Sequence, residues 1–176
     1  MTTPKKIKKP TKRRHIKKTT KSLVTKKVKK SRLEKNRENP FSMYWKRRAY
    51  ELWSRIVRQF DEYKCCICGN DIKTQAHHTL AKEAYYLLSL DPRVGICLCS
   101  RHHKFGKDSA HKNGIFFAEW LKANRPYQYD WCVRHLKEFS KSGQNKENWM
   151  NYKEICEKLE EIEKKNLKHI ELDWNN

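Results

Sequence analysis

The chain has 176 residues, enough for one ordinary domain or for a small domain with long appendages. It carries 41 Lys and Arg against 20 Asp and Glu, a formal net charge of +21, and its apolar fraction of 37% predicts a modest core. No run is apolar enough to span a bilayer, and the first forty residues hold no apolar signal segment, so we expect no membrane partner and a cytoplasmic location. A charge this positive predicts a polyanionic partner, most simply nucleic acid.

The charge is concentrated in the first forty residues. They hold 17 Lys and Arg against only Glu34 and Glu38, and they are poor in apolar side chains. A segment of this composition buries too little surface to offset its ordering entropy, so it predicts a disordered basic arm over residues 1–40. We expect the arm to follow nucleic-acid phosphates; a solvated tail that only aids solubility is the alternative.

Order is expected from Phe41 onwards. Ser42 can cap a helix in which apolar residues recur at helical spacing as far as Phe60, with Lys and Arg on its other sides. The expected nucleic-acid contacts come from the arm and from the basic face of this helix: Lys5, Lys6, Arg13, Arg14, Lys29, Lys30, Arg47 and Arg48.

The elements that follow are short and mixed. Asn151 and Glu154 resemble a capping box at the start of the last helix. The pattern predicts a small α+β fold, with an ordered domain over 41–140 and a C-terminal helical extension over 141–176. The expected elements are a cysteine turn over 64–70, extended runs around 72 and over 75–79, a short helix or helical loop over 81–90, a turn over 91–95, a strand over 96–99, and helices from 100, over 114–123, over 126–139 and after 151.

Two motifs with metal-ligand spacing stand on either side of the extended runs. The first is Cys65-x-x-Cys68-Gly and the second is Cys99-x-x-His102. Each turn directs two ligands at one ion, and two such turns complete the tetrahedron that Zn²⁺ prefers, so the spacing predicts a structural zinc ion. The remaining cysteines are expected to be neighbours that can substitute in register (Cys66, Cys97) or packing residues (Cys132, Cys156).

Surplus histidines surround this zinc motif. His77 and His78 are adjacent on an extended segment, so their side chains should point to opposite faces. His103 directly follows the expected zinc ligand His102, and His111 lies further along the chain. One surplus histidine is most simply a core or surface residue, but this group predicts a second metal site with a free imidazole base beside it.

The chain resembles the HNH endonuclease family, of the zinc-containing ββα-metal (His-Me finger) type. The helix before the first motif is similar to the lead-in helix of phage-encoded HNH proteins, and similarity to NinG-type phage recombination proteins is looser. The resemblance covers about residues 45–130. It implies a zinc-bound, treble-clef-like ββα-metal core flanked by helices, and the host cytoplasm as location if the chain is phage-encoded. It is carried by Cys65-x-x-Cys68-Gly, Ala76-His77-His78, Asp91-Pro-Arg-x-Gly-Ile96 and Leu98-Cys-x-x-His-His103.

The resemblance also implies a reaction and a set of roles. The reaction is metal-dependent hydrolysis of DNA phosphodiester bonds that leaves 5′-phosphate and 3′-hydroxyl ends. His78 matches the general base that takes a proton from the attacking water. His77 and His103 match ligands of the catalytic divalent ion, and His111 is a candidate third ligand. Because His77 stands where the family often has Asp, we expect Mn²⁺, Ni²⁺ or Co²⁺ to work at least as well as Mg²⁺.

Two positions depart from the family pattern. His102 replaces the usual fourth cysteine, an exchange that zinc tolerates. Val94 stands where the family's central Asn orients the base, so a backbone carbonyl or another side chain would have to hold the His78 tautomer. The main expectation is a nuclease acting on double-stranded or branched DNA. Two alternative functions remain: a catalytically silent, zinc-stabilised DNA-binding module, and an RNA-binding or RNA-processing zinc protein.

Overall fold

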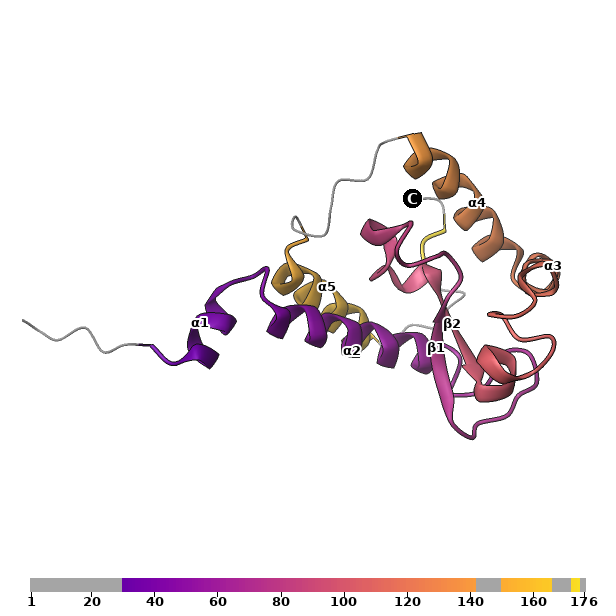
Figure 1. Ribbon diagram of the computed structural model, residues 1–176, viewed down its shortest axis with the longest axis horizontal. Coiled ribbons are helices and arrows are strands. Elements are labelled where there is room, and N and C mark those ends of the chain that lie inside the picture. Colours follow the sequence, from indigo (N-terminus) through magenta and orange to yellow (C-terminus); the bar gives the residue numbers. More distant parts are fainter. Residues whose placement is uncertain (1–29, 142–149, 166–171, 175–176) are drawn as a thin grey trace, which may run out of the picture. The chain divides into compact units, whose positions relative to one another are not determined.

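A two-stranded antiparallel sheet with helices on both sides forms the described part of the chain (Figure 1). The computed structural model describes residues 30–141, 150–165 and 172–174. The small α+β prediction is confirmed for these residues. The expected basic contacts Lys5, Lys6, Arg13, Arg14 and Lys29 lie outside them.

A short helix, α1 (Arg32–Glu38), lies inside the segment expected to be disordered. A capping box stabilises its start, since the Ser31 hydroxyl accepts from the Glu34 N–H and the Glu34 carboxylate accepts from the Ser31 N–H. The prediction of disorder is therefore wrong for residues 32–38. The capping signal was present in the sequence, and the surrounding charge obscured it.

The long helix α2 (Met43–Phe60) begins after Ser42, as the sequence predicts. Ser42 does not cap it through its side chain, because its hydroxyl donates to the Asn36 carbonyl (2.5 Å) and so ties α2 to α1. The apolar stripe of α2 is the centre of the larger hydrophobic core, which also takes residues from the following loops, α4 and α5. The buried residues of α2 are Ala49, Leu52, Trp53, Ile56, Val57 and Phe60.

The sheet pairs β1 (Thr74–His78) with β2 (Gly95–Cys99). His77 lies opposite Ile96 and His78 opposite Gly95. Every residue of β2 is buried, which explains its nearly continuous apolar sequence. The connection contains two 3-10 turns, η1 (Tyr86–Leu88) and η2 (Pro92–Val94). The extended run expected around Ile72 forms no strand, and Ile72 itself is exposed.

Gly95 allows the sheet to lie directly on α2. A Cβ atom at this position would lie only 2.1 Å from a Val57 methyl carbon. The buried Gln128 side chain then holds the same strand end, because its amide donates to the Arg93 and Gly95 carbonyls at 2.8 and 2.9 Å. A residue without a side chain is thus required where β2 begins.

The second strand leads into a single π-helical turn, η3 (Arg101–Phe105), and then into α3 (Gly114–Asn124) and α4 (Pro126–Lys141). A buried ion pair joins these parts to the end of α2. The Asp61 carboxylate accepts from the Cys97 N–H (2.7 Å) and from the Arg125 guanidinium (2.5 Å). Because the Asp61 side chain is only 4% exposed, this contact fixes the α3–α4 junction against β2.

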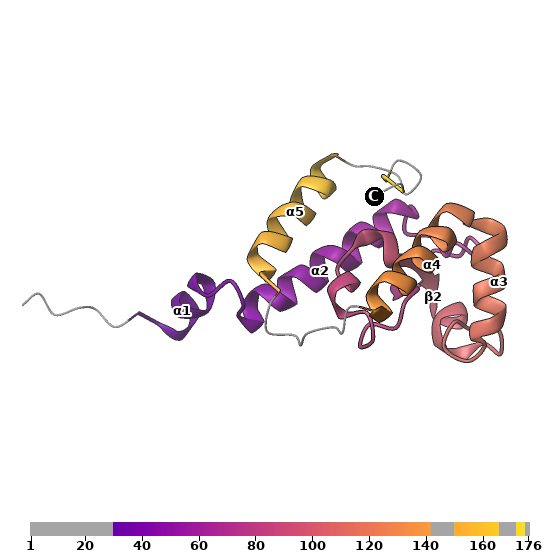
Figure 2. The ribbon, with the colours of Figure 1, turned by 90° about the horizontal axis from the view of Figure 1, so that it is seen from above.

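The last helix, α5 (Tyr152–Lys165), packs along α2 on the side away from α3 and α4 (Figure 2). Its buried residues Tyr152, Cys156 and Leu159 belong to the same core as α2. Glutamates of α5 pair with the basic face of α2, through Arg48–Glu160 and Arg55–Glu163. The helix α5 is therefore part of the main core. Among the residues that the structure describes, no helix has both the length and the apolar character that crossing a membrane requires.

Candidate functional site

The four predicted zinc ligands come together in one cluster. Cys65 and Cys68 are on the turn after α2, Cys99 ends β2, and His102 is in η3. The Nδ1 atom of His102 lies 3.5 Å from the Cys65 sulfur and 3.4 Å from the Cys99 sulfur, and the Cys68 and Cys99 sulfurs are 3.9 Å apart. The cluster could hold a metal ion such as zinc.

These distances fit a tetrahedral zinc site. With ordinary Zn–S and Zn–N lengths, two sulfurs of such a site lie about 3.8 Å apart, and a sulfur and a nitrogen about 3.6 Å apart. Burial raises the pKa of the Cys65 thiol to about 11, so a thiolate at this position needs a cation beside it. The donor set and its spacing therefore suit the ion that the sequence predicts.

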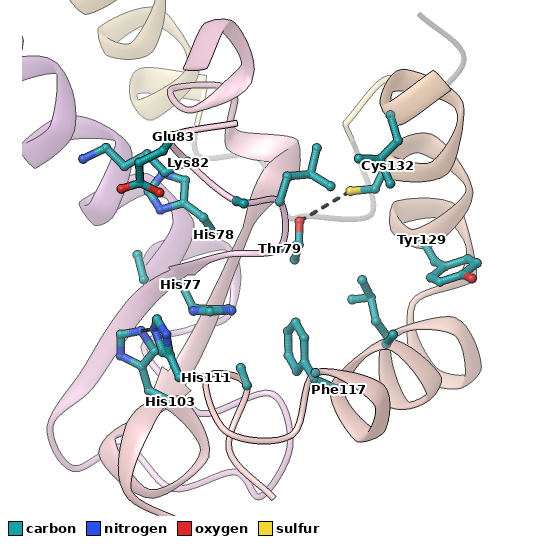
Figure 3. Close-up of a pocket in the computed structure, with 18 of the residues that line it drawn as sticks. His77, His78, Thr79, Lys82, Glu83, His103, His111, Phe117, Tyr129 and Cys132 are labelled. Atoms are coloured by element: carbon teal, nitrogen blue, oxygen red, sulfur yellow. Dashed lines mark hydrogen bonds between the residues drawn. The ribbon is translucent and has the colours of Figure 1, made fainter. Parts of the chain in front are cut away.

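A second cluster consists of three histidines from three segments. His77 is on β1, His103 is in η3, and His111 is in the loop before α3. One ring nitrogen of each lies within 4.8 Å of those of the other two, and the Nε2 atoms of His103 and His111 are 3.2 Å apart. Figure 3 shows His103 and His111 side by side, with His77 next to them on the strand. The structure thus brings together all three residues expected at a second metal site.

Neighbouring side chains orient these rings. The His103 Nδ1–H donates to the Gln75 side-chain oxygen at 2.6 Å, which leaves Nε2 as the unprotonated nitrogen facing His111. The Phe117 ring contacts His77 edge to face, with centroids 5.2 Å apart. Burial and the nearby imidazoles lower the pKa of His77 to about 3 and that of His103 to about 4. Both rings are neutral at pH 7, as metal ligands must be.

The two clusters meet at one peptide bond, between His102 and His103. The π-helical turn, closed by the Gly106 N–H on the Arg101 carbonyl, directs these adjacent side chains to different clusters. The chain then folds back, so that the Ala110 and His111 N–H groups donate to the His102 and His103 carbonyls at 2.8 and 3.3 Å. This return explains how His111 reaches the cluster despite its distance in sequence.

His78, the expected general base, points away from the three-histidine cluster, on the other face of β1. Its ring stacks on Trp53 of α2, with centroids 3.9 Å apart and planes 11° apart. Its Nε2–H donates to the Ser89 carbonyl at 2.8 Å, which leaves Nδ1 free to accept a proton. Burial lowers the pKa of His78, so this ring too is neutral at pH 7.

Val94 has no polar atom to offer His78, and it is fully buried in the larger core. Its backbone carbonyl accepts from the N–H and the hydroxyl of Thr79, directly after His78. The Ser89 carbonyl and the stacked Trp53 ring orient the His78 side chain instead.

A cleft of about 740 Å³ runs beside β1 and includes both histidine groups in its lining. His77, His78, His103 and His111 lie along one side, and residues of α3 and α4, among them Phe117, lie across from them (Figure 3). Although His77 and His78 leave the strand on opposite faces, both reach this cleft. A substrate held there would contact the three-histidine cluster and the possible base together.

Three of the expected nucleic-acid contacts, Lys30, Arg47 and Arg48, lie in the part of the chain that the structure describes. Lys30 and Arg47 are exposed. Arg48 is engaged within the protein, since its guanidinium pairs with Glu160 and this pairing raises its pKa. The basic face of α2 is therefore partly neutralised by α5, an effect that the sequence alone did not indicate.

Sequence reasoning did not single out several residues that position the site. Gln75 precedes His77 by two residues, so strand alternation could have placed both on one face. Trp53 is one of the apolar residues at helical spacing in α2, a pattern that indicates burial alone, and the role of the Ser89 carbonyl has no side-chain signal at all. No family model, no curated protein and no solved structure matches the chain.

Proposed function

We propose that the chain is a metal-dependent endonuclease of the HNH type that hydrolyses phosphodiester bonds in DNA. The observation that carries the proposal is the meeting of three histidine side chains, two of them with lowered pKa values, on one side of a cleft that also contains a fourth, oriented histidine. Clusters of neutral histidines with fixed tautomers are typical of metal sites, and a neutral histidine near them is a typical general base.

The three-histidine cluster is the proposed ligand set of the catalytic ion. His77, His103 and His111 offer one nitrogen each, and Gln75 and Phe117 restrict the rotation of two of the rings. A divalent ion bound there supplies charge that stabilises the developing negative charge on the scissile phosphate. Because imidazole is a softer ligand than carboxylate, Mn²⁺, Ni²⁺ or Co²⁺ should support the reaction at least as well as Mg²⁺.

His78 is the proposed general base. Its Nδ1 accepts a proton from the attacking water, while the Ser89 carbonyl keeps the proton on Nε2. Stacking on Trp53 restricts the ring plane and so the direction of the Nδ1 lone pair. The Cys65, Cys68, Cys99 and His102 cluster is proposed to be structural and to hold η3, and thereby His103, in place.

Nicking of supercoiled plasmid DNA by the purified full chain tests the proposal. We expect nicking with Mn²⁺ or Mg²⁺, none with EDTA, and a loss of at least about 100-fold in His78→Ala. His135→Ala is the matched control, since His135 stacks on Trp131 and does not line the cleft. Thermal unfolding of both variants verifies that each is folded.

The opposite results point to the other candidate functions. Salt-sensitive DNA binding without cleavage in any metal would contradict the nuclease and favour a zinc-stabilised DNA-binding module. Binding that prefers structured RNA over duplex and branched DNA in competition would favour an RNA-binding protein. Cleavage that persists in His78→Ala would contradict the proposed role of His78 but not the nuclease activity.

A further inference from the structure

The cleft beside β1 has two chemically different sides. Its volume of about 740 Å³ lies in the range of about 300–1,000 Å³ that is usual for small-ligand sites. One side carries the histidines together with Lys104, which is exposed and follows His103 directly. The other side is formed by the helices α3 and α4 and is mainly apolar (Figure 3).

The apolar side is a continuous surface. Three of its residues, Tyr129, Val133 and Leu136, follow one another at spacings of four and three and so share one face of α4. All three are half-buried and keep part of their side chains open to the cleft. From α3, Ala118 is exposed in the same cleft. The Thr79 hydroxyl and the Cys132 thiol, which also line the cleft, are 3.4 Å apart and connect the end of β1 to α4.

A nucleotide has the same division into a polar and an apolar part. Its phosphate suits the side with Lys104 and the three-histidine cluster, and its base has two apolar faces that suit an aromatic and aliphatic surface. In an intact duplex both faces are covered by stacking, so a base can reach a recessed apolar surface only when it is unpaired or flipped out. A substrate that stayed fully double-stranded would leave this side of the cleft unused.

We propose that the apolar side of this cleft, formed by Ala118, Tyr129, Val133 and Leu136, receives an unstacked base, so that the preferred substrate is single-stranded or locally unpaired DNA. The inference deepens the proposed function and rests on it for the identity of the ligand. The base lies against α3 and α4, and the adjoining phosphate faces the three-histidine cluster across the cleft.

Filling the cleft tests this inference. Ala118→Trp places a large side chain in the cleft and replaces no histidine, and Ala123→Trp is the matched control, since Ala123 is exposed on the same helix and does not line the cleft. The probes are a phosphorothioate single strand, its perfect duplex, and the duplex with a central mismatch, and binding is measured by fluorescence anisotropy. The affinities are compared over a salt series, because the basic residues 1–40 attract any polyanion.

We expect the wild-type chain to bind the single strand and the mismatched duplex roughly tenfold more tightly than the perfect duplex. Ala118→Trp should remove this preference, and Ala123→Trp should retain it. Ala118→Leu is a smaller change and should reduce this preference only in part. It replaces Ala118→Trp in the experiment if the Trp variant does not fold. Equal affinities in the wild-type chain, or equal behaviour of the two Trp variants, would overturn the inference.

Plasmid nicking with the same preparations separates this inference from the proposed function. Nicking without any preference for unpaired DNA would retain the nuclease and reject the base site. A preference that Ala118→Trp abolishes, without nicking in any metal, would retain the base site and reject the nuclease.

Discussion

His77 and His78 show how much depends on one position in a strand. Alternation sends His77 to His103 and His111 and sends His78 to Trp53, so two adjacent and identical residues have different partners. Each ring owes its orientation to a group from another part of the chain. For His103 that group is Gln75, whose amide oxygen accepts the Nδ1 proton.

Gln75 should control the metal affinity of the three-histidine cluster. Gln75→Leu removes the acceptor that fixes the His103 tautomer, so we expect binding of Mn²⁺ or Co²⁺ to weaken by about 10- to 100-fold. Gln75→Glu retains an acceptor and should bind at least as tightly as the wild-type chain. Isothermal titration of zinc-loaded protein measures both affinities. Equal affinity in Gln75→Leu and the wild-type chain would show that Gln75 does not position His103.

At the scale of elements, contacts between helices and the sheet determine where the site lies. Gly95 brings β2 against α2, and this contact holds His78, opposite Gly95 in the sheet, next to Trp53. Gly95→Ala should lower the free energy of unfolding by about 1–3 kcal/mol, because the new methyl group would overlap Val57. Urea unfolding measures the loss.

Two further variants test the cause of that loss. In Gly95→Ala/Val57→Ala the overlap is relieved, so the double variant should lose at least about 0.5 kcal/mol less than the sum of the single variants. Gly114→Ala is the matched control, since a Cβ atom there has no neighbour within 4 Å. Additive losses, or an equal loss in Gly114→Ala, would refute the steric explanation.

The pairing of α5 with α2 should depend on pH. The Arg55 side chain lowers the pKa of Glu163 below its ordinary value of 4.5, through hydrogen bonding first and charge second. The stabilisation is thus present above pH 4.5 and is lost as the pH falls through the lowered pKa. Since Arg55 is about half exposed, we expect Glu163→Gln to cost only about 0.5 kcal/mol at pH 7 and less at pH 3.

Urea unfolding at the two pH values measures this difference. Glu161→Gln is the control, because Glu161 is exposed on the same helix, and it should change the free energy of unfolding less than Glu163→Gln at pH 7. A cost of Glu163→Gln that is the same at both pH values would show that the ion pair is not its source.

The sequence predicts much of this architecture, for identifiable reasons. The apolar stripe of α2, the buried strand β2 and the Cys65 and Cys99 motifs follow local rules of periodicity and ligand spacing, and the structure places them as expected. The burial predicted for Cys132 and Cys156 is also confirmed. What local rules could not reveal are contacts between distant segments, such as the Ser89 carbonyl on His78 or Glu160 on Arg48.

At the scale of the whole molecule, the cluster of Cys65, Cys68, Cys99 and His102 should stabilise the fold. Cys68→Ala removes an exposed thiol ligand, so we expect the bound zinc to fall and the unfolding temperature to drop by roughly 10 °C or more. Cys66→Ala is the matched control, because this neighbouring thiol is outside the cluster. Metal analysis and thermal unfolding test both variants. Full zinc content in Cys68→Ala, or equal loss in Cys66→Ala, would mean that the ligand set is wrong.

On the proposed function, the peptide bond shared by His102 and His103 makes the three-histidine cluster depend on the zinc cluster. The loop that carries His111 is bonded to the carbonyls of these two residues, so a chain without zinc would lack the frame that holds the second ion. On the proposed function, a newly made chain is therefore harmless to the DNA around it until it has acquired zinc. The supply of zinc would then determine when the catalytic ion can bind and DNA cleavage can begin.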